Sequence, residues 1–195
     1  MSNSLKAESR GNKGFLLGMI AVVLFGLVGK AHAQCSNPAN AIVAENCLPG
    51  NDSSEWDVKT QDGGDPTIQG FATDISVNQG STVYFKINTP AKNYTINIYR
   101  VGYYGGMGAR KVATISPSVP LPQSQPACIT DSSTGLIDCG NWGVSASWQV
   151  PATATSGVYF AHLVRSDTGG DSHIVFVVRN DSSHSAILDQ TSDET

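Results

Sequence analysis

The residues best suited to bind a ligand are concentrated in the segment YRVGYYGGMGAR, between Tyr99 and Arg110. Its glycines, at positions 102, 105, 106 and 108, resemble those of a phosphate-binding loop. Such a loop needs a helix N-terminus behind it, whereas these glycines lie between two strand-like runs, so phosphate binding is disfavoured. Two interpretations remain open. One is a wide hairpin connection whose tyrosines cover the end of the fold. The other is a docking surface for another domain or a ligand, formed by Tyr99, Arg100, Tyr103, Tyr104 and Arg110.

Other residue types give little sign of catalysis. His162 alternates with apolar residues in a strand-like run, so we expect a hydrogen-bonded histidine in the core or at a sheet edge. A Ser-His-Asp hydrolase of the G-x-S-x-G type is excluded because that motif does not occur. Asp57, Asp62 and Asp65 are carried by a loop and lack the closing glutamate of an EF-hand. We therefore assign no catalytic, cofactor-binding or metal-binding residue to this chain.

The four cysteines, Cys35, Cys47, Cys128 and Cys139, favour two disulfides, because their number is even and the chain carries an export signal. Of the three possible connectivities we prefer Cys35 with Cys47 and Cys128 with Cys139, since each pair closes a short loop. A zinc site is disfavoured, because 11 and 10 residues separate the members of these pairs and no C-x2-C knuckle occurs.

The N-terminus predicts a secretory signal peptide over residues 1–33. Lys6, Arg10 and Lys13 precede an uninterrupted apolar run of 14 residues, Phe15 to Val28, which is followed by the cleavage pattern Ala-His-Ala at residues 31–33. The run is shorter than the roughly 20 residues of a membrane span, although an uncleaved anchor is the alternative. Cleavage leaves eight basic and fifteen acidic residues, a net charge of −7. We expect a secreted or periplasmic protein that binds no nucleic acid and no membrane.

Short apolar runs bounded by turn residues predict an all-β domain. In Thr82 to Asn88, Val83, Phe85 and Ile87 share one face, and in Tyr94 to Val101, Tyr94, Ile96 and Ile98 do so. Glycine-bearing turns at 78–81 and 167–171 predict hairpins. We expect an antiparallel immunoglobulin-like or fibronectin III-like β-sandwich, with a small closed barrel as the alternative. The expected strands are Ile68–Thr73, Asp74–Val77, Thr82–Asn88, Tyr94–Val101, Arg110–Ile115, Ala146–Val150, Gly157–Arg165 and His173–Arg179.

The mature chain is expected to have three parts. Residues 34–64 form a loop-rich lead-in pinned by a disulfide, residues 65–180 form the β-sandwich, and residues 181–195 begin a linker into a missing downstream domain. The last two strands are apolar on both faces for most of their length, so they should lie centrally in the sheets.

Three blocks of the sequence carry a family resemblance: IYRVGYYGGMGARKVATI (98–115), CGNWGVSASWQVPATATSGVYFAHLVR (139–165) and SHIVFVVRNDSSHSAILDQTSD (172–193). From about Trp56 onward the chain resembles the N-terminal portion of secreted proteins related to the large (beta) subunit of N,N-dimethylformamidase. The resemblance implies an Ig-like sandwich that leads into a larger amidohydrolase-like domain. It also implies an iron held by tyrosine and glutamate side chains further along, so no cofactor is expected in this chain itself.

From these observations we expect a non-catalytic β-sandwich of an exported C–N amide hydrolase-like protein, which scaffolds a catalytic domain downstream in the same chain. The alternative is a stand-alone extracellular module that binds glycan or protein through Tyr103, Tyr104, Trp142 and Trp148. Whether the complete protein is an enzyme stays open.

Overall fold

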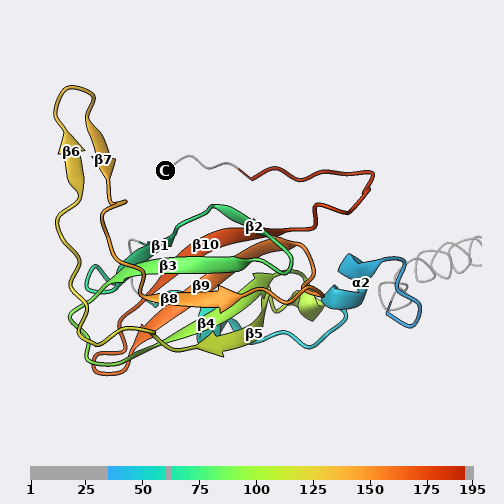
Figure 1. Ribbon diagram of the computed structural model, residues 1–195. Helices are drawn as coiled ribbons and strands as arrows, with labels where there is room; N and C mark the ends of the chain where they lie inside the picture. The colour runs from blue at the N-terminus through green and yellow to red at the C-terminus, as the bar shows by residue number, and fades with distance from the viewer. Residues whose placement is uncertain (1–34, 60–62, 192–195) are drawn as a thin grey trace, which may run out of the picture. The chain divides into compact units, whose positions relative to one another are not determined.

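The alternation of apolar and polar residues builds two facing β-sheets in the computed structural model, which describes residues 35–59 and 63–191 (Figure 1). The chain divides into two compact units, residues 1–39 and 40–195, and every element below belongs to the second. The predicted signal peptide, its cleavage site at Gln34 and the loop residue Asp62 lie outside the described residues.

The smaller sheet contains three antiparallel strands in the order β1-β3-β8. They are β1 (Gln69–Ala72), β3 (Thr82–Asn88) and β8 (Ala146–Gln149). The larger sheet contains five strands in the order β2-β10-β9-β4-β5. They are β2 (Ser76–Asn78), β4 (Tyr94–Val101), β5 (Ala109–Ile115), β9 (Gly157–Arg165) and β10 (Asp171–Arg179). Two separate sheets confirm the predicted sandwich and exclude the closed barrel.

The strand neighbours follow the immunoglobulin pattern closely, with one departure from the predicted connections. Residues 167–171 join β9 to β10 as the predicted hairpin, and β9 and β10 lie inside the larger sheet. The turn at 78–81 is not a hairpin, however, because β2 belongs to the larger sheet and β3 to the smaller one. Strand β2 runs parallel to β10. The sheet is therefore not purely antiparallel, since the chain crosses between sheets on both sides of β2.

The core lies between the sheets and consists of the residues that the alternation predicts. Val83, Phe85 and Ile87 from β3 are fully buried, and Tyr94, Ile96 and Ile98 from β4 face them across the sandwich. Burying side chains of this size stabilises the fold by about 1.5–3 kcal/mol each relative to exposure. Trp148, which the alternative function assigned to binding, packs here against Tyr159 and Phe176.

Two short helices lie in the lead-in, which was expected to be rich in loops and for which no helix was predicted. Helix α2 (Ala41–Asn46) begins at Asn40, whose side chain accepts a hydrogen bond from Val43 N, and α3 (Ser53–Trp56) begins at Asp52. Such caps satisfy backbone donors that a helix leaves unpaired. Helices of six and four residues are too short to show an apolar period, which is why periodicity does not reveal them.

A second unpredicted element is a two-stranded hairpin that stands apart from both sheets (Figure 1). It consists of β6 (Ile129–Asp131) and β7 (Leu136–Asp138), and the Cys128–Cys139 disulfide closes its base. Cys35 and Cys47 are also disulfide-bonded, so the two predicted disulfides are confirmed. Disulfides persist in oxidising compartments, which fits export. Within the described ranges, none of the helices has the length and apolar character needed to cross a membrane.

Candidate functional site

Strands β4 and β5 and the connection between them hold all five residues of the predicted docking surface, and the connection folds as the predicted wide hairpin connection. A 3-10 turn, η2 (Tyr104–Gly106), forms its tip. Tyr104 has a φ of 43°, and Gly105, Gly106 and Gly108 also have positive φ. Glycine adopts this conformation without steric cost. The glycines therefore let the chain reverse sharply while Tyr104 points into the protein, where it is only 2% exposed.

Arg100 lies inside the protein and is held by acceptors from three segments. Its guanidinium donates to Val101 O (3.1 Å), to Ser156 O (2.9 Å) and to Tyr104 Oη (3.1 Å). A buried arginine is tolerated only when its donors are satisfied and its charge is balanced. The carbonyl oxygens satisfy the donors, and a nearby carboxylate balances the charge.

That carboxylate belongs to Glu45 in helix α2. Its Oε1 atom accepts from Tyr104 Oη (2.9 Å) and from the Nε and Nη2 atoms of Arg110 (2.8 and 2.6 Å). We call Glu45, Arg100, Tyr104 and Arg110 the Glu45 network. It joins α2 to the β4–β5 connection, and Asn46 Oδ1 adds a hydrogen bond from Tyr103 N (2.6 Å). The network therefore fastens the lead-in to the sandwich.

The electrostatics of the Glu45 network follow from burial. Burial raises the pKa of the Tyr104 hydroxyl, although its hydrogen bond from Arg100 acts in the opposite direction. Burial acts to lower the pKa of Arg110, but the hydrogen bond and charge of Glu45 outweigh it and the pKa is raised. Burial also raises the pKa of nearby Tyr159 to about 12. These tyrosines therefore stay neutral, and neither is suited to act as a base near pH 7.

The prediction of one exposed docking surface is wrong for three of its five residues. Tyr99, Arg100 and Tyr104 are 1%, 4% and 2% exposed. Tyr99 stacks on Phe160 with ring centroids 5.3 Å apart and donates to Glu55 O (3.2 Å). Only Tyr103 is strongly exposed, at 69%. These residues are buried because the lead-in covers the outer face of the larger sheet, which the sequence did not indicate.

Tyr104 and Glu45 offer the two ligand types that the family resemblance associates with iron, but their surroundings do not fit a metal ion. The carboxylate oxygen of Glu45 is bound by Arg110, and the Tyr104 oxygen accepts from Arg100. Two guanidinium groups would repel a cation at this place. Within residues 35–59 and 63–191 there is also no group of three or more His, Cys, Asp or Glu side chains arranged to hold a metal ion.

The histidines of the larger sheet are structural, as expected for His162. Its Nε2 atom lies 3.0 Å from Asp171 Oδ2, and both side chains are buried. Opposite it in the sheet, His173 Nε2 donates to Trp56 O (2.6 Å). Burial lowers the pKa of His173, and the hydrogen bond to Trp56 O only partly opposes that effect. His173 is therefore neutral near pH 7, with Nδ1 as its acceptor atom.

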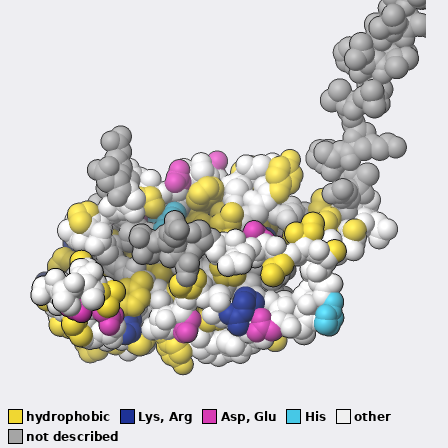
Figure 2. Space-filling view, turned by 90° about the horizontal axis from the view of Figure 1, so that it is seen from above, with side chains coloured by type: hydrophobic (Ala, Val, Ile, Leu, Met, Phe, Trp, Pro, Cys, Tyr) yellow, Lys and Arg dark blue, Asp and Glu magenta, His cyan; other side chains and the backbone are white. Residues whose placement is uncertain are grey.

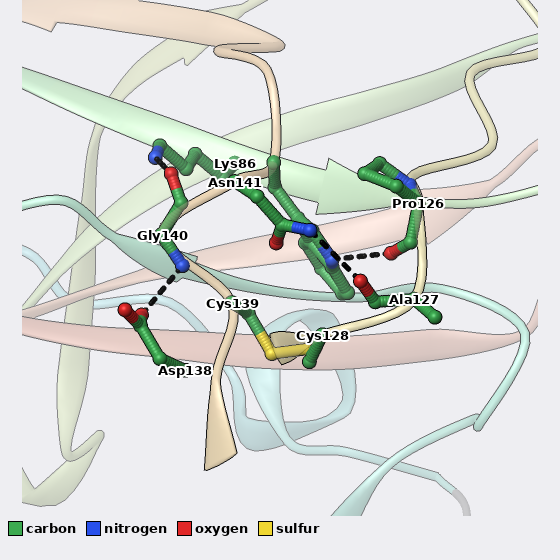
Figure 3. Close-up of a disulfide and its surroundings, with 9 residues drawn as sticks. Lys86, Pro126, Ala127, Cys128, Asp138, Cys139, Gly140 and Asn141 are labelled. Carbon is green, nitrogen blue, oxygen red and sulfur yellow. Dashed lines mark hydrogen bonds between the residues drawn. A yellow bond between two sulfur atoms is a disulfide. The ribbon is translucent and has the colours of Figure 1, made fainter. Parts of the chain in front are cut away.

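Trp142 is the tryptophan of the alternative function that stays near the surface. It follows the hairpin, and its ring centroid lies 5.7 Å from that of Phe71 in β1. Figure 3 shows how the base of the hairpin is tied down beside it: Asn141 Nδ2 donates to Ala127 O (2.8 Å), and Lys86 Nζ donates to Gly140 O (2.8 Å). The sequence alone does not single out Phe71 as a surface residue, because nothing in the β1 run distinguishes it from a core residue.

The face seen in Figure 2 carries few lysine or arginine side chains, and apolar side chains are interspersed with polar ones. This agrees with the acidic composition of the chain. Large single-sign positive patches attract nucleic acid. The charge distribution on this face gives no support to such a partner.

Comparison with known proteins gives one family match. A family model described as "N,N-dimethylformamidase beta subunit-like, C-terminal" matches residues 95–195. No curated protein matches the chain.

Similar solved structures include a cellulose-active LPMO in complex with copper (14% identity, TM-score 0.34, 56% of this chain and 54% of that chain). A superoxide reductase from Ignicoccus hospitalis is also similar, with 11% identity and a TM-score of 0.31 over 58% of this chain and 80% of that chain. A third is a chitin-binding domain from Burkholderia pseudomallei, with 15% identity and a TM-score of 0.30 over 55% of this chain and 57% of that chain. The chain spans about half the length of the first and third. With TM-scores below 0.5, none of them bears on function.

Proposed function

The chain belongs to the N,N-dimethylformamidase beta subunit-like family, and we propose that it supplies a non-catalytic β-sandwich to an exported protein of this family. Its role is to support and orient an adjoining hydrolase domain that acts on C–N amide bonds. The partner of the sandwich is thus another domain of the same protein, and any iron would belong to that domain.

The Glu45 network is the observation that carries this proposal. The residues at the β4–β5 end of the sandwich with the chemistry for proton transfer or ion binding are Tyr104, the two arginines and Glu45 from helix α2. All four bind one another or backbone carbonyls. Groups committed in this way rigidify a fold and are not available to a substrate. A rigid sandwich with its polar groups turned inward suits a supporting role.

Export is supported by two independent features. The N-terminal 33 residues have the charge, apolar run and small-residue site of a signal peptide. All four cysteines are disulfide-bonded, which fits an oxidising compartment. We infer that the protein acts outside the cytoplasm, in the periplasm or the medium.

The coding sequence after the codon for Thr195 tests the supporting role. The proposal predicts that the frame continues into a second domain with tyrosine and glutamate side chains able to bind iron. A native stop codon directly after Thr195 would contradict it. A continuing frame whose product, purified with iron, hydrolyses no small amide would contradict the assignment to amide hydrolysis.

A further inference from the structure

An open trough of about 300 Å³ lies between strand β1 and the first residues of β10. Its lining includes Gln69, Gly70 and Phe71 from β1, Ser172 and His173 from β10, and Trp142 from the segment that follows the hairpin. The trough thus joins the two sheets at one edge of the sandwich. Small-molecule sites have volumes of roughly 300–1,000 Å³, so this trough is at the lower end of that range.

Two aromatic rings form the apolar part of the trough. The ring centroids of Phe71 and Trp142 lie 5.7 Å apart and their planes are inclined by 43°. Both side chains are half-buried, which leaves part of each ring open to solvent. Lys86 Nζ lies 5.8 Å from the Phe71 centroid and donates to Gly140 O, so the trough has a cation at its border. Exposed aromatic faces beside polar groups favour a ligand with one apolar face and a polar rim.

Trp142 is held in place before any ligand arrives. Its Nε1 atom donates to Pro126 O (2.9 Å), and the next residue, Gly143, donates from its backbone N to Gln125 Oε1 (2.9 Å). The Cys128–Cys139 disulfide closes the hairpin base three residues before Trp142 (Figure 3). A preorganised ring loses little conformational entropy on binding, which favours affinity.

The polar part of the trough offers both hydrogen-bond donors and hydrogen-bond acceptors. Gln69 is exposed, and its side-chain amide makes no hydrogen bond with the rest of the described chain, so it has free donors and a free acceptor. Ser172 and His173 also line this part of the trough.

We propose that the trough binds one pyranose ring of a polysaccharide, whose apolar face lies against Trp142 and Phe71 and whose hydroxyl groups bond to Gln69. The trough is open and partly polar, which suits a hydrated ring within an extended chain better than a fully apolar molecule that needs enclosure. Lys86 favours neutral or anionic chains over cationic ones. This activity goes beyond the supporting role and does not depend on it.

Native affinity electrophoresis of the mature chain, residues 34–195, tests the proposal. The gels contain hydroxyethyl cellulose, glycol chitin or polygalacturonate, so that the neutral, acetamido and anionic sugars are compared separately. We expect at least one polysaccharide to retard the protein. Phe71→Ala should weaken that binding by about ten-fold or more, and Gln69→Ala, which changes an exposed side chain, by about two- to five-fold. Tyr103→Ala is the matched control, since it removes an exposed aromatic ring that does not line the trough.

Three outcomes decide the matter. Retardation that Phe71→Ala and Gln69→Ala both reduce, while Tyr103→Ala does not, supports the site. An unretarded wild-type protein in all three gels overturns it. Binding that Tyr103→Ala weakens as much as Phe71→Ala also overturns it, because the ligand would then lie elsewhere. The Gln69→Ala variant keeps the test valid if Phe71→Ala unfolds, which circular dichroism would reveal.

Discussion

Removing the Glu45 carboxylate should destabilise the whole sandwich, although Glu45 lies in a short helix outside it. In Glu45→Ala, Arg110 loses both of its bonds to Oε1 and Tyr104 loses its acceptor. The buried guanidinium of Arg100 then has no carboxylate nearby. Breaking a buried ion pair by removing one partner costs about 3–5 kcal/mol. The side chain of Arg110 is 26% exposed, so solvent recovers part of this cost and we expect about 2–4 kcal/mol.

The assay is thermal unfolding of the mature chain followed by circular dichroism. For a domain of this size, each kcal/mol lost from the free energy of unfolding lowers Tm by about 2–4 °C. Tm should therefore fall by about 5–15 °C. Glu55→Ala is the matched control, because Glu55 lies in the other short helix and its carboxylate accepts an exposed hydrogen bond from Asn51 Nδ2 (3.0 Å). We expect that control to change Tm by less than about 3 °C. Equal, small shifts in both variants would refute the view that the Glu45 network fastens the lead-in to the sandwich.

Three further predictions concern Tyr104, His173 and the hairpin disulfide. Tyr104→Phe removes the hydroxyl between Arg100 and Glu45 and should cost about 1–2 kcal/mol in denaturant unfolding, whereas exposed Tyr103→Phe should cost nothing measurable. Because burial holds the pKa of His173 below its unfolded value of 6.5, the unfolded chain binds the proton first, so stability should decline as pH falls below about 6.5. His173→Gln should show a smaller decline between about pH 7 and 5.5 than the wild-type protein, and an equal decline in both would contradict this source. The double substitution Cys128→Ser and Cys139→Ser should speed amide hydrogen exchange in β6 and β7 while the core strands keep their protection, since the disulfide closes only the hairpin.

The sandwich was predictable because alternation directly reports which face of a strand is buried. Strands β3, β4 and β9 have the bounds that their apolar patterns indicate, and Val83, Phe85 and Ile87 face the core as expected. The sheet to which a short strand belongs was not predictable in the same way. Strand β2 is only three residues long, and its pairing with β10 depends on contacts about 100 residues away in the chain.

The candidate site was harder to predict than the fold, because residue type does not reveal what covers a residue. Tyr99, Arg100 and Tyr104 suggested an exposed surface, but the lead-in and η2 bury them. The one local signal for Glu45 was the helix-capping residue Asn40, which precedes α2 by one position. The pairing of Phe71 with Trp142 could not be foreseen, since it depends on how the hairpin returns to the smaller sheet.

The central claim, that this sandwich supports a hydrolase domain and performs no chemistry itself, is tested most directly by an amide hydrolysis assay on the purified mature chain. Residues 34–195, with both disulfides intact, would be incubated with N,N-dimethylformamide and other small amides, with and without added iron. The account predicts no release of amine above the buffer rate in either condition. Turnover by this chain alone, abolished by heat unfolding, would contradict it.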